Sequence, residues 1–181
     1  MYDINRTLLF WGGTSMNYTR SEVLQYVEDH DVKFIRLAFC DIHGMQKNVA
    51  IMPSELNRAF ETGVSFDASF VRGFMNEGKS DLFLVPDPST FNIMPWRPSH
   101  GQVVRLFCDI KTPDGQPFAG DCRALLRAAV RDAREMDLSC KVGTGCEFYL
   151  FKTDESGEPT MEPYDYGTYC DIAPRDKCEN V

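Results

Sequence analysis

Apolar and polar residues alternate, or recur with a helical period, along much of residues 16–112. Two stretches show the helical period, and the first begins with Thr19 and Glu22 at the spacing of a capping box. Four other stretches are short, rich in β-forming residues and bounded by turn residues. The pattern therefore predicts helices at 20–29 and from Pro53 towards Gly63, and strands at 33–40, 47–51, 82–85 and 102–110.

Two glycines mark boundaries between these elements. Gly44 lies in the turn between the first two strands and Gly63 follows the second helix, so we expect a positive φ at both. Residues 66–79 are polar, lack a clear period and predict no element. The order of elements indicates an α+β module, a small mixed sheet with two helices on one side, which ends near the turn at 112–115.

Beyond that turn the pattern predicts a helix, a strand and a loop. Asp121 is placed to cap a helix that runs to about Met136. Residues 147–151 are expected to form a strand, and residues 153–163 a loop. The apolar stripe expected on the helix consists of Leu125, Leu126, Ala129, Val130, Ala133 and Met136.

Composition narrows the class of protein. A chain of 181 residues corresponds to one domain, or to one domain with part of another. The net charge is −8, and an acidic chain without a basic stripe argues against nucleic-acid binding. No apolar run approaches the roughly 20 residues that span a membrane. Seven cysteines, an odd number without a CxxC pair, favour reduced thiols in the cytoplasm over a disulfide framework.

Residues 1–15 show no clear period. Trp11-Gly12-Gly13 back-translates to a sequence that contains a ribosome-binding site at a suitable distance before Met16. We therefore hypothesise that Met16 is the natural start and that 1–15 is a leader from a start codon placed too early. The alternative is a short arm that packs against a partner.

Six strings after Met16 occur in one order and together resemble the bacterial type I glutamine synthetases. The strings are RLAFCDIHGMQKNVAI, FDASFVRGF, SDLFLVPDPSTFNIMPW, FCDIKTPDGQPFAGDCR, GTGCEFYLF and YCDIAPRDKCENV. The resemblance implies a β-grasp domain over 16–112, followed over 118–181 by the start of the catalytic α+β domain. It also implies a longer enzyme, since the family continues beyond residue 181 with a pair of arginines.

The family makes glutamine from glutamate, ammonia and ATP through γ-glutamyl phosphate. Two divalent ions, Mg²⁺ or Mn²⁺, neutralise phosphate charge in such a transfer, and carboxylates suit them as ligands. The family assembles as a homo-oligomer, a twelve-subunit double ring with active sites between neighbours. Much of that machinery lies beyond residue 181, so we expect the isolated chain to be inactive and do not assume that it forms the ring.

The resemblance assigns two catalytic aspartates. Asp67 matches an aspartate that helps to bind and deprotonate ammonium, and a carboxylate there is apt because it attracts a cation and accepts a proton. Asp81 matches a second acidic position at the same subunit boundary. The family commonly has Gly-Ser-Ser after the first aspartate, whereas this chain has Ala68-Ser69-Phe70. Without the resemblance, the two residues read as a loop N-cap and a solvated acid.

Two further assignments lie in the last forty residues. Glu147 matches a metal-binding glutamate, although a glutamate on the polar face of a half-buried strand is the plain alternative. The family has a second ligand glutamate two residues earlier, on the same face of the strand. Gly145 occupies that position, so metal binding is expected to be weakened. Tyr169 matches a tyrosine of the substrate and ammonium pocket, or is a half-buried structural tyrosine.

Two alternative functions stay open. A related γ-glutamyl ligase would use an organic amine, since these strings hardly test the acceptor. A decayed copy would instead be a non-catalytic β-grasp module for interaction or assembly, which Gly145 favours.

Overall fold

The computed structural model describes residues 17–74, 80–95, 101–143, 145 and 149–178. The described residues of Thr14–Cys140 form one compact unit, and those of Lys141–Val181 belong to a second. The first unit holds a six-stranded sheet and three α-helices, and the second holds a two-stranded hairpin.

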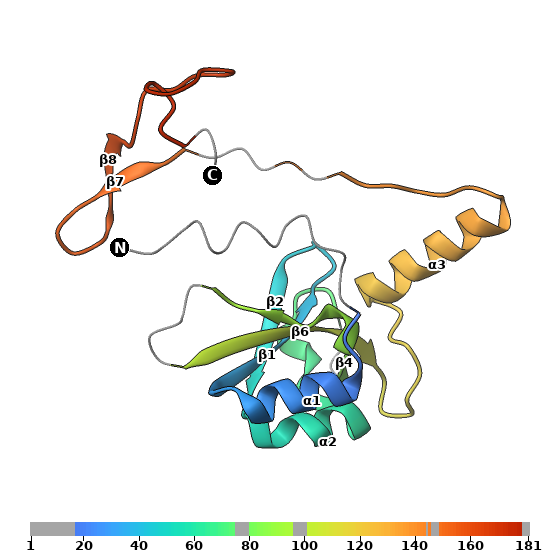
Figure 1. Cartoon of the computed structure of the whole chain (residues 1–181). Coiled ribbons are helices and arrows are strands. Elements are labelled where there is room, and N and C mark those ends of the chain that lie inside the picture. Colours follow the sequence, from blue (N-terminus) through green and yellow to red (C-terminus); the bar gives the residue numbers. More distant parts are fainter. Residues whose placement is uncertain (1–16, 75–79, 96–100, 144, 146–148, 179–181) are drawn as a thin grey trace. The chain divides into compact units, whose positions relative to one another are not determined.

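The elements of the first unit follow the predicted order closely (Figure 1). The capping box of Thr19 and Glu22 is formed, and both expected glycines take a positive φ, 78° at Gly44 and 74° at Gly63. The α-helices are α1 (Arg20–Asp29), α2 (Leu56–Thr62) and α3 (Cys122–Glu135), and single 3-10 turns are η3 (Pro53–Glu55), η4 (Ala68–Phe70) and η5 (Pro88–Thr90). The strands are β1 (Val32–Cys40), β2 (Gln46–Ile51), β3 (Val64–Asp67), β4 (Asp81–Pro86), β5 (Asn92–Ile93) and β6 (Gln102–Lys111).

The sheet is mixed, as expected. Its order is β2-β1-β6-β4-β3, with β5 also paired to β6. The β1–β6 pair is parallel and the other pairs are antiparallel. Helices α1 and α2 lie together along one face of this sheet (Figure 1). The α+β architecture predicted from the pattern is therefore confirmed.

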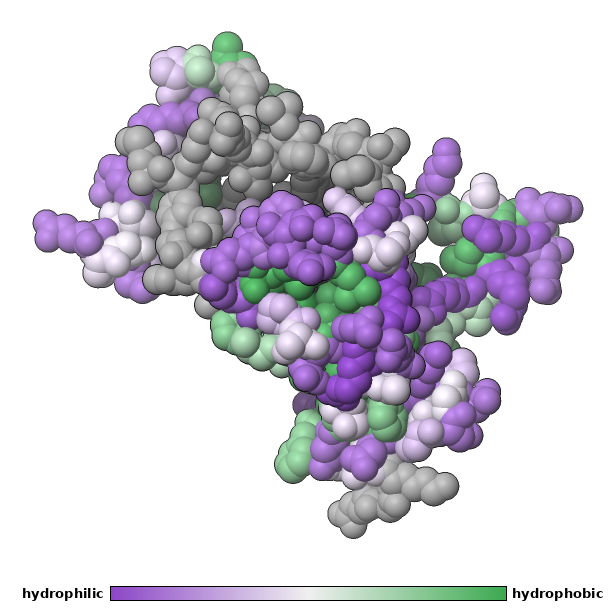
Figure 2. Space-filling model, turned by 60° about the horizontal axis from the view of Figure 1, so that its bottom comes forward, coloured by the Kyte–Doolittle hydropathy of each residue, from purple (hydrophilic) through white to green (hydrophobic). Residues whose placement is uncertain are grey.

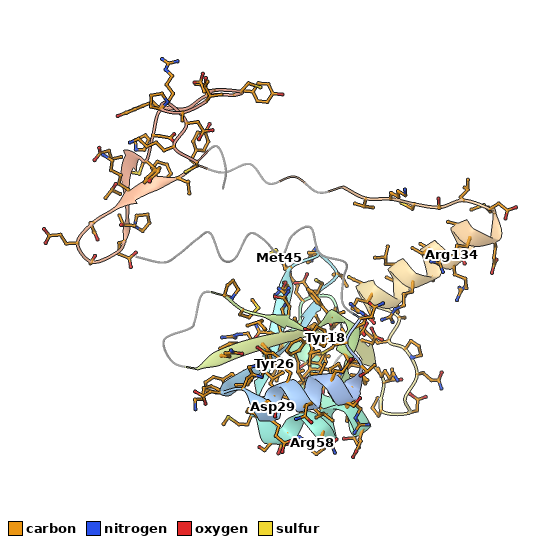
Figure 3. All side chains as sticks on the ribbon, viewed as in Figure 1. Tyr18, Tyr26, Asp29, Met45, Arg58 and Arg134 are labelled. Atoms are coloured by element: carbon orange, nitrogen blue, oxygen red, sulfur yellow. The ribbon has the colours of Figure 1, made fainter. Side chains whose placement is uncertain are left out.

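The core lies between that sheet face and the two helices. Val23 of α1 and Leu56 of α2 are fully buried there, beside Leu37 of β1 and Leu106 of β6. Tyr18 and Tyr26 close one end of it by packing edge-on against Phe91, with ring centroids 4.9 and 5.0 Å apart (Figure 3). The opposite face of the sheet carries the charged residues considered below.

One expectation for this unit is wrong. Residues 66–79 were expected to form no element, yet Phe66 and Asp67 end strand β3 and are followed by η4. The strand is only four residues long, and Phe66 is its last apolar residue. Pairing with β4 decides its conformation, and the local pattern is too short to reveal it.

Helix α3 begins as expected, with the Asp121 side chain accepting a hydrogen bond from the backbone of Arg123. None of its residues is fully buried, and Leu125 and Leu126 are 57% and 64% exposed. Hydrophobic and hydrophilic side chains lie next to each other on the right of Figure 2, where α3 lies. Arg134 stands in the last turn, where a cation suits the helix dipole (Figure 3).

The second unit contains the hairpin of β7 (Phe151–Thr153) and β8 (Pro159–Pro163). The strand expected at 147–151 begins only at Phe151 within the described residues, and the loop expected at 153–163 contains β8. The pattern was misleading because β8 includes two prolines, which are rare inside strands and are tolerated here in a two-stranded ribbon.

No helix in the described residues is long and apolar enough to cross a bilayer.

Candidate functional site

Asp67 and Asp81 lie directly opposite each other in the β3–β4 ladder. The register pairs Phe66 with Leu82, and the next pair is Asp67 with Asp81. Leu82 is buried and Phe66 packs on the core, so the side chains of the two aspartates project from the other face of the sheet. Side chains directly opposite each other have Cβ atoms about 4.5–5.5 Å apart. The tertiary structure thus brings together two residues that are separate in the sequence.

Asp67 is held by the residues around the turn. Its Oδ1 accepts hydrogen bonds from the Ser69 backbone N–H at 2.9 Å and from the Ser69 hydroxyl at 2.6 Å. The Ser69 hydroxyl, then the Ser69 backbone and the Ser80 side chain, lower the pKa of Asp67 below its ordinary value. Backbone Ala68 N–H also donates to the Ser80 carbonyl at 2.7 Å. These bonds hold Asp67 ionised and orient its carboxylate.

The pair carries unbalanced negative charge. Both side chains are exposed, and neither makes an ion pair within the described part of the chain. Like charges directly opposite each other destabilise a sheet by about 0.2–1 kcal/mol. A cation between them would remove that cost, so the arrangement suits binding of a small cation.

A second charged cluster on the same sheet face is neutralised internally. Asp109 of β6 accepts hydrogen bonds from Arg127 at 2.8 and 2.6 Å and from Arg123 at 3.0 Å. Arg123 also reaches Asp87, which follows β4, at 2.5 Å. Desolvation acts to raise the pKa of Asp109, but the hydrogen bonds from Arg127 and Arg123 outweigh it and lower that pKa. The Asp87–Asp109–Arg123–Arg127 cluster holds the first turns of α3 against the sheet.

The sequence-predicted residues of the second unit are not brought into a described site. Tyr169 is 98% exposed within that unit. Glu147 lies outside the described residues. Gly145 has an ordinary φ, and a Cβ placed on it would meet no atom within 4 Å. The glycine is therefore not required by the backbone or by packing.

Metal binding finds little support in the described residues taken alone. No three His, Cys, Asp or Glu side chains among them gather closely enough to hold an ion. Gly145 supplies no side-chain donor atom. The described part of the chain does not fit a complete metal site.

A shallow cavity of about 250 Å³ lies elsewhere on the first unit, between the end of α2 and the turn after β6. Phe60, Phe83 and Lys111 are among its lining residues, and neither candidate aspartate lines it. The Asp67–Asp81 pair is an open surface site at the end of two strands.

Sequence reasoning missed two features of these sites. Ser80 precedes Asp81 and contacts Asp67, and only the β3–β4 pairing shows that it does. The ion pairs of α3 were also missed, although Arg123 and Arg127 stand four residues apart and so share one face of the helix. Spacing could have found the arginines, but not their partners.

Two family models match the chain. Residues 31–113 match the β-grasp domain of glutamine synthetase, and residues 119–181 match its catalytic domain. The second match begins at residue 119, whereas the compact unit that contains the sheet continues to Cys140. Helix α3 therefore belongs by sequence to the second family domain and packs with the first.

Similar proteins support the same assignment. The chain is 47% identical over 163 residues to glutamine synthetase of Methanosarcina mazei, covering 90% of this chain and 36% of that protein. It is 45% identical over 164 residues to glutamine synthetase of Clostridium saccharobutylicum, covering 91% of this chain and 37% of the relative. A solved Plasmodium falciparum glutamine synthetase shares the fold, with a TM-score of 0.59 and 22% identity over 65% of this chain and 23% of that one. The chain spans just over a third of the length of these curated relatives.

Proposed function

Because the chain belongs to the glutamine synthetase family, we propose that it supplies the acceptor-binding carboxylates of an ATP-dependent glutamate–ammonia ligase that acts in the cytoplasm. The observation that carries this proposal is the placement of Asp67 opposite Asp81 without a cationic partner in the described residues. Ammonium is a small cation that such a pair attracts. We assign the binding of glutamate and ATP to none of the described residues.

The two carboxylates have complementary tasks in this proposal. The hydrogen bonds from Ser69 lower the pKa of Asp67, which makes it a weaker base but keeps it ionised as a cation ligand. Ammonium must lose one proton before its nitrogen attacks the γ-glutamyl carbon, and a carboxylate of the pair accepts that proton. The C–N bond then forms, the C–O bond to phosphate breaks, and the nitrogen loses a second proton, which the leaving phosphate accepts.

A divalent metal, Mg²⁺ or Mn²⁺, would neutralise phosphate charge during transfer from ATP. The described residues do not fit a complete site for it, and Glu147 is the one ligand position that the sequence assigns. We therefore propose that the 181-residue chain by itself does not form glutamine. We also propose that activity requires the family's homo-oligomeric arrangement, in which neighbouring subunits share each site.

An organic amine is the second candidate acceptor. Phe70 ends the η4 turn that Asp67 caps, and its side chain is 88% exposed. If its ring turned toward the carboxylates, it would favour alkylammonium ions through cation–π attraction and apolar contact. A small primary amine is therefore the competitor to test against ammonia.

A chimera tests the proposal without relying on the second unit. Residues 17–140 of this chain would replace the matching segment of the M. mazei enzyme, which is 47% identical over the aligned region. We expect the chimera to form glutamine from glutamate, ammonia and MgATP. Asp67→Asn and Asp81→Asn should reduce use of ammonia while leaving ATP binding intact.

Three outcomes decide between the candidate functions. Preference for methylamine over ammonia, reduced by Phe70→Ser, would support the amine ligase. A folded chimera that is inactive with both acceptors would support a non-catalytic module and overturn the ligase proposal. Unchanged use of ammonia in Asp67→Asn and Asp81→Asn would overturn the assignment of the two aspartates.

A further inference from the structure

Cys40 is the last residue of β1 and lies on the sheet face away from α1 and α2. Leu37 and Phe39 belong to the core, and side chains alternate along a strand, so Cys40 projects from the opposite face. Its side chain is only half-buried. A small oxidant can therefore reach this thiol.

The start of α3 lies over the same face. The parallel pairing of β1 with β6 ends with Ala38 opposite Phe107, two residues before Cys40 on β1 and two residues before Asp109 on β6. Asp109 is the carboxylate that Arg123 and Arg127 of α3 bind. The strand end that carries Cys40 is thus adjacent to the strand position on which α3 is anchored.

Cys122 is the first residue of α3, and its side chain points back to β1. The Cys122 Sγ–H donates to the carbonyl oxygen of Asp41 at 3.2 Å, and Asp41 is the residue next to Cys40. Both thiols are half-buried and free. Burial first, and then the charges of Cys122, Asp41 and Asp121, raise the pKa of Cys40, so the two thiols lie within electrostatic range of each other.

We propose that Cys40 and Cys122 are a redox-sensitive pair that forms an intramolecular disulfide between β1 and the first turn of α3. This bond would join the region that matches the β-grasp model to the region that matches the catalytic model. In the reduced chain, α3 is held by hydrogen bonds and ion pairs, which salt weakens. Oxidation would make that attachment covalent, and reduction would return it to hydrogen bonds and ion pairs alone.

A peroxide is the class of oxidant that the step requires. One thiolate attacks a peroxide oxygen, so that an S–O bond forms, the O–O bond breaks and water leaves after protonation. The second thiolate attacks the sulfenic sulfur, so that the S–S bond forms, the S–O bond breaks and a second water leaves. Two thiols and one peroxide give one disulfide and two waters. The raised pKa of Cys40 keeps that thiol protonated at neutral pH and so slows its own reaction with peroxide.

Peptide mapping of the intact 181-residue chain tests the proposal. The reduced protein would be treated with hydrogen peroxide, alkylated, digested without reductant and analysed by mass spectrometry. We expect the dominant cross-linked peptide to join Cys40 to Cys122, at a loss of two hydrogens that dithiothreitol restores. Cys40→Ser and Cys122→Ser should each remove this peptide, and the exposed Cys140→Ser should not.

Other results of the same experiment would contradict the proposal. A dominant disulfide between any other two cysteines, or between two chains, would overturn the proposal. So would oxidation of Cys40 or Cys122 to sulfinic acid without a cross-link. The decisive peptide comes from the unmutated protein, so the test does not depend on whether a serine variant folds.

Discussion

Asp67 and Asp81 face each other across the end of the β3–β4 ladder, at positions where opposite charges would stabilise the sheet. Like charges directly opposite each other are unfavourable in a sheet, although Asp81 is not among the groups that shift the pKa of Asp67. Removing one charge should therefore stabilise the fold while it impairs cation binding. Such a conflict between stability and charge placement is typical of a functional site.

Asp81→Asn should raise the free energy of unfolding by about 0.5 kcal/mol, because it removes the repulsion and keeps the shape of the side chain. Urea denaturation at low salt would measure the gain, which should shrink at high salt. Glu28→Gln at an exposed position of helix α1 serves as the control that removes an unrelated negative charge. A less stable Asp81→Asn variant would contradict the account of the pair.

Ser69→Ala should raise the pKa of Asp67 towards its ordinary value, because the Ser69 hydroxyl is the largest cause of the lowered pKa. A carboxyl whose pKa is lower in the folded state than in the unfolded state stabilises the fold at pH values above its unfolded-state pKa. This stabilisation is lost as the pH falls through the folded-state pKa. The variant should lose part of that contribution. NMR titration of the Asp67 carboxyl carbon measures the shift, and Ser65→Ala on the same strand is the matched control. An unchanged pKa would show that Ser69 does not hold this carboxylate.

Acid should release α3 from the sheet. The bonds from Arg127 and Arg123 lower the pKa of Asp109 below its ordinary value of 3.8, so this anchor is intact above that value and is lost as pH falls through the folded-state pKa. Asp109→Asn should weaken the anchor at neutral pH by about 2 kcal/mol. Cleavage of α3 by trypsin at neutral pH would report the loss. Equal cleavage of α3 in Asp109→Asn and the unmutated chain would contradict this role.

Gly145→Glu should restore a carboxylate at no steric cost, since the backbone is ordinary there and the space is open. Two carboxylates two residues apart in the sequence supply more oxygen ligands, and so bind a hard cation better than one does. We expect Mn²⁺ to bind this variant more tightly in calorimetry. Gly145→Gln, which is isosteric and neutral, should leave the affinity unchanged. Equal affinity in the two variants would argue against a metal-binding role for this position.

Leu126→Gln should reduce self-association of the chain without lowering its stability. The Leu126 side chain is 64% exposed on α3, so the change removes apolar surface from water rather than from a core. Sedimentation and thermal unfolding would measure the two effects. By contrast, Leu106→Ala in the centre of the sheet should cost about 3 kcal/mol. A large loss of stability in Leu126→Gln would show that this face is packed.

Local signals in the sequence were sufficient for much of the first unit. The capping box at Thr19, the positive φ of Gly44 and the start of α3 at Asp121 were all predicted, because neighbouring residues decide each of them. Strand β3 and strand β8 were not predicted. The first is short and the second contains prolines, so pairing with a partner strand decides both.

The sequence by itself determined the family and the α+β class, and it singled out the two aspartates as candidates, because motifs and periodicity are local properties of the chain. Only the tertiary structure decided that Asp67 lies opposite Asp81, that Ser69 and Ser80 lower the pKa of Asp67, and that Cys122 contacts the strand end beside Cys40. These relationships depend on strand register and on how a helix packs against a sheet. Both are set by the burial of the core between the sheet and the helices, which joins residues far apart in the sequence.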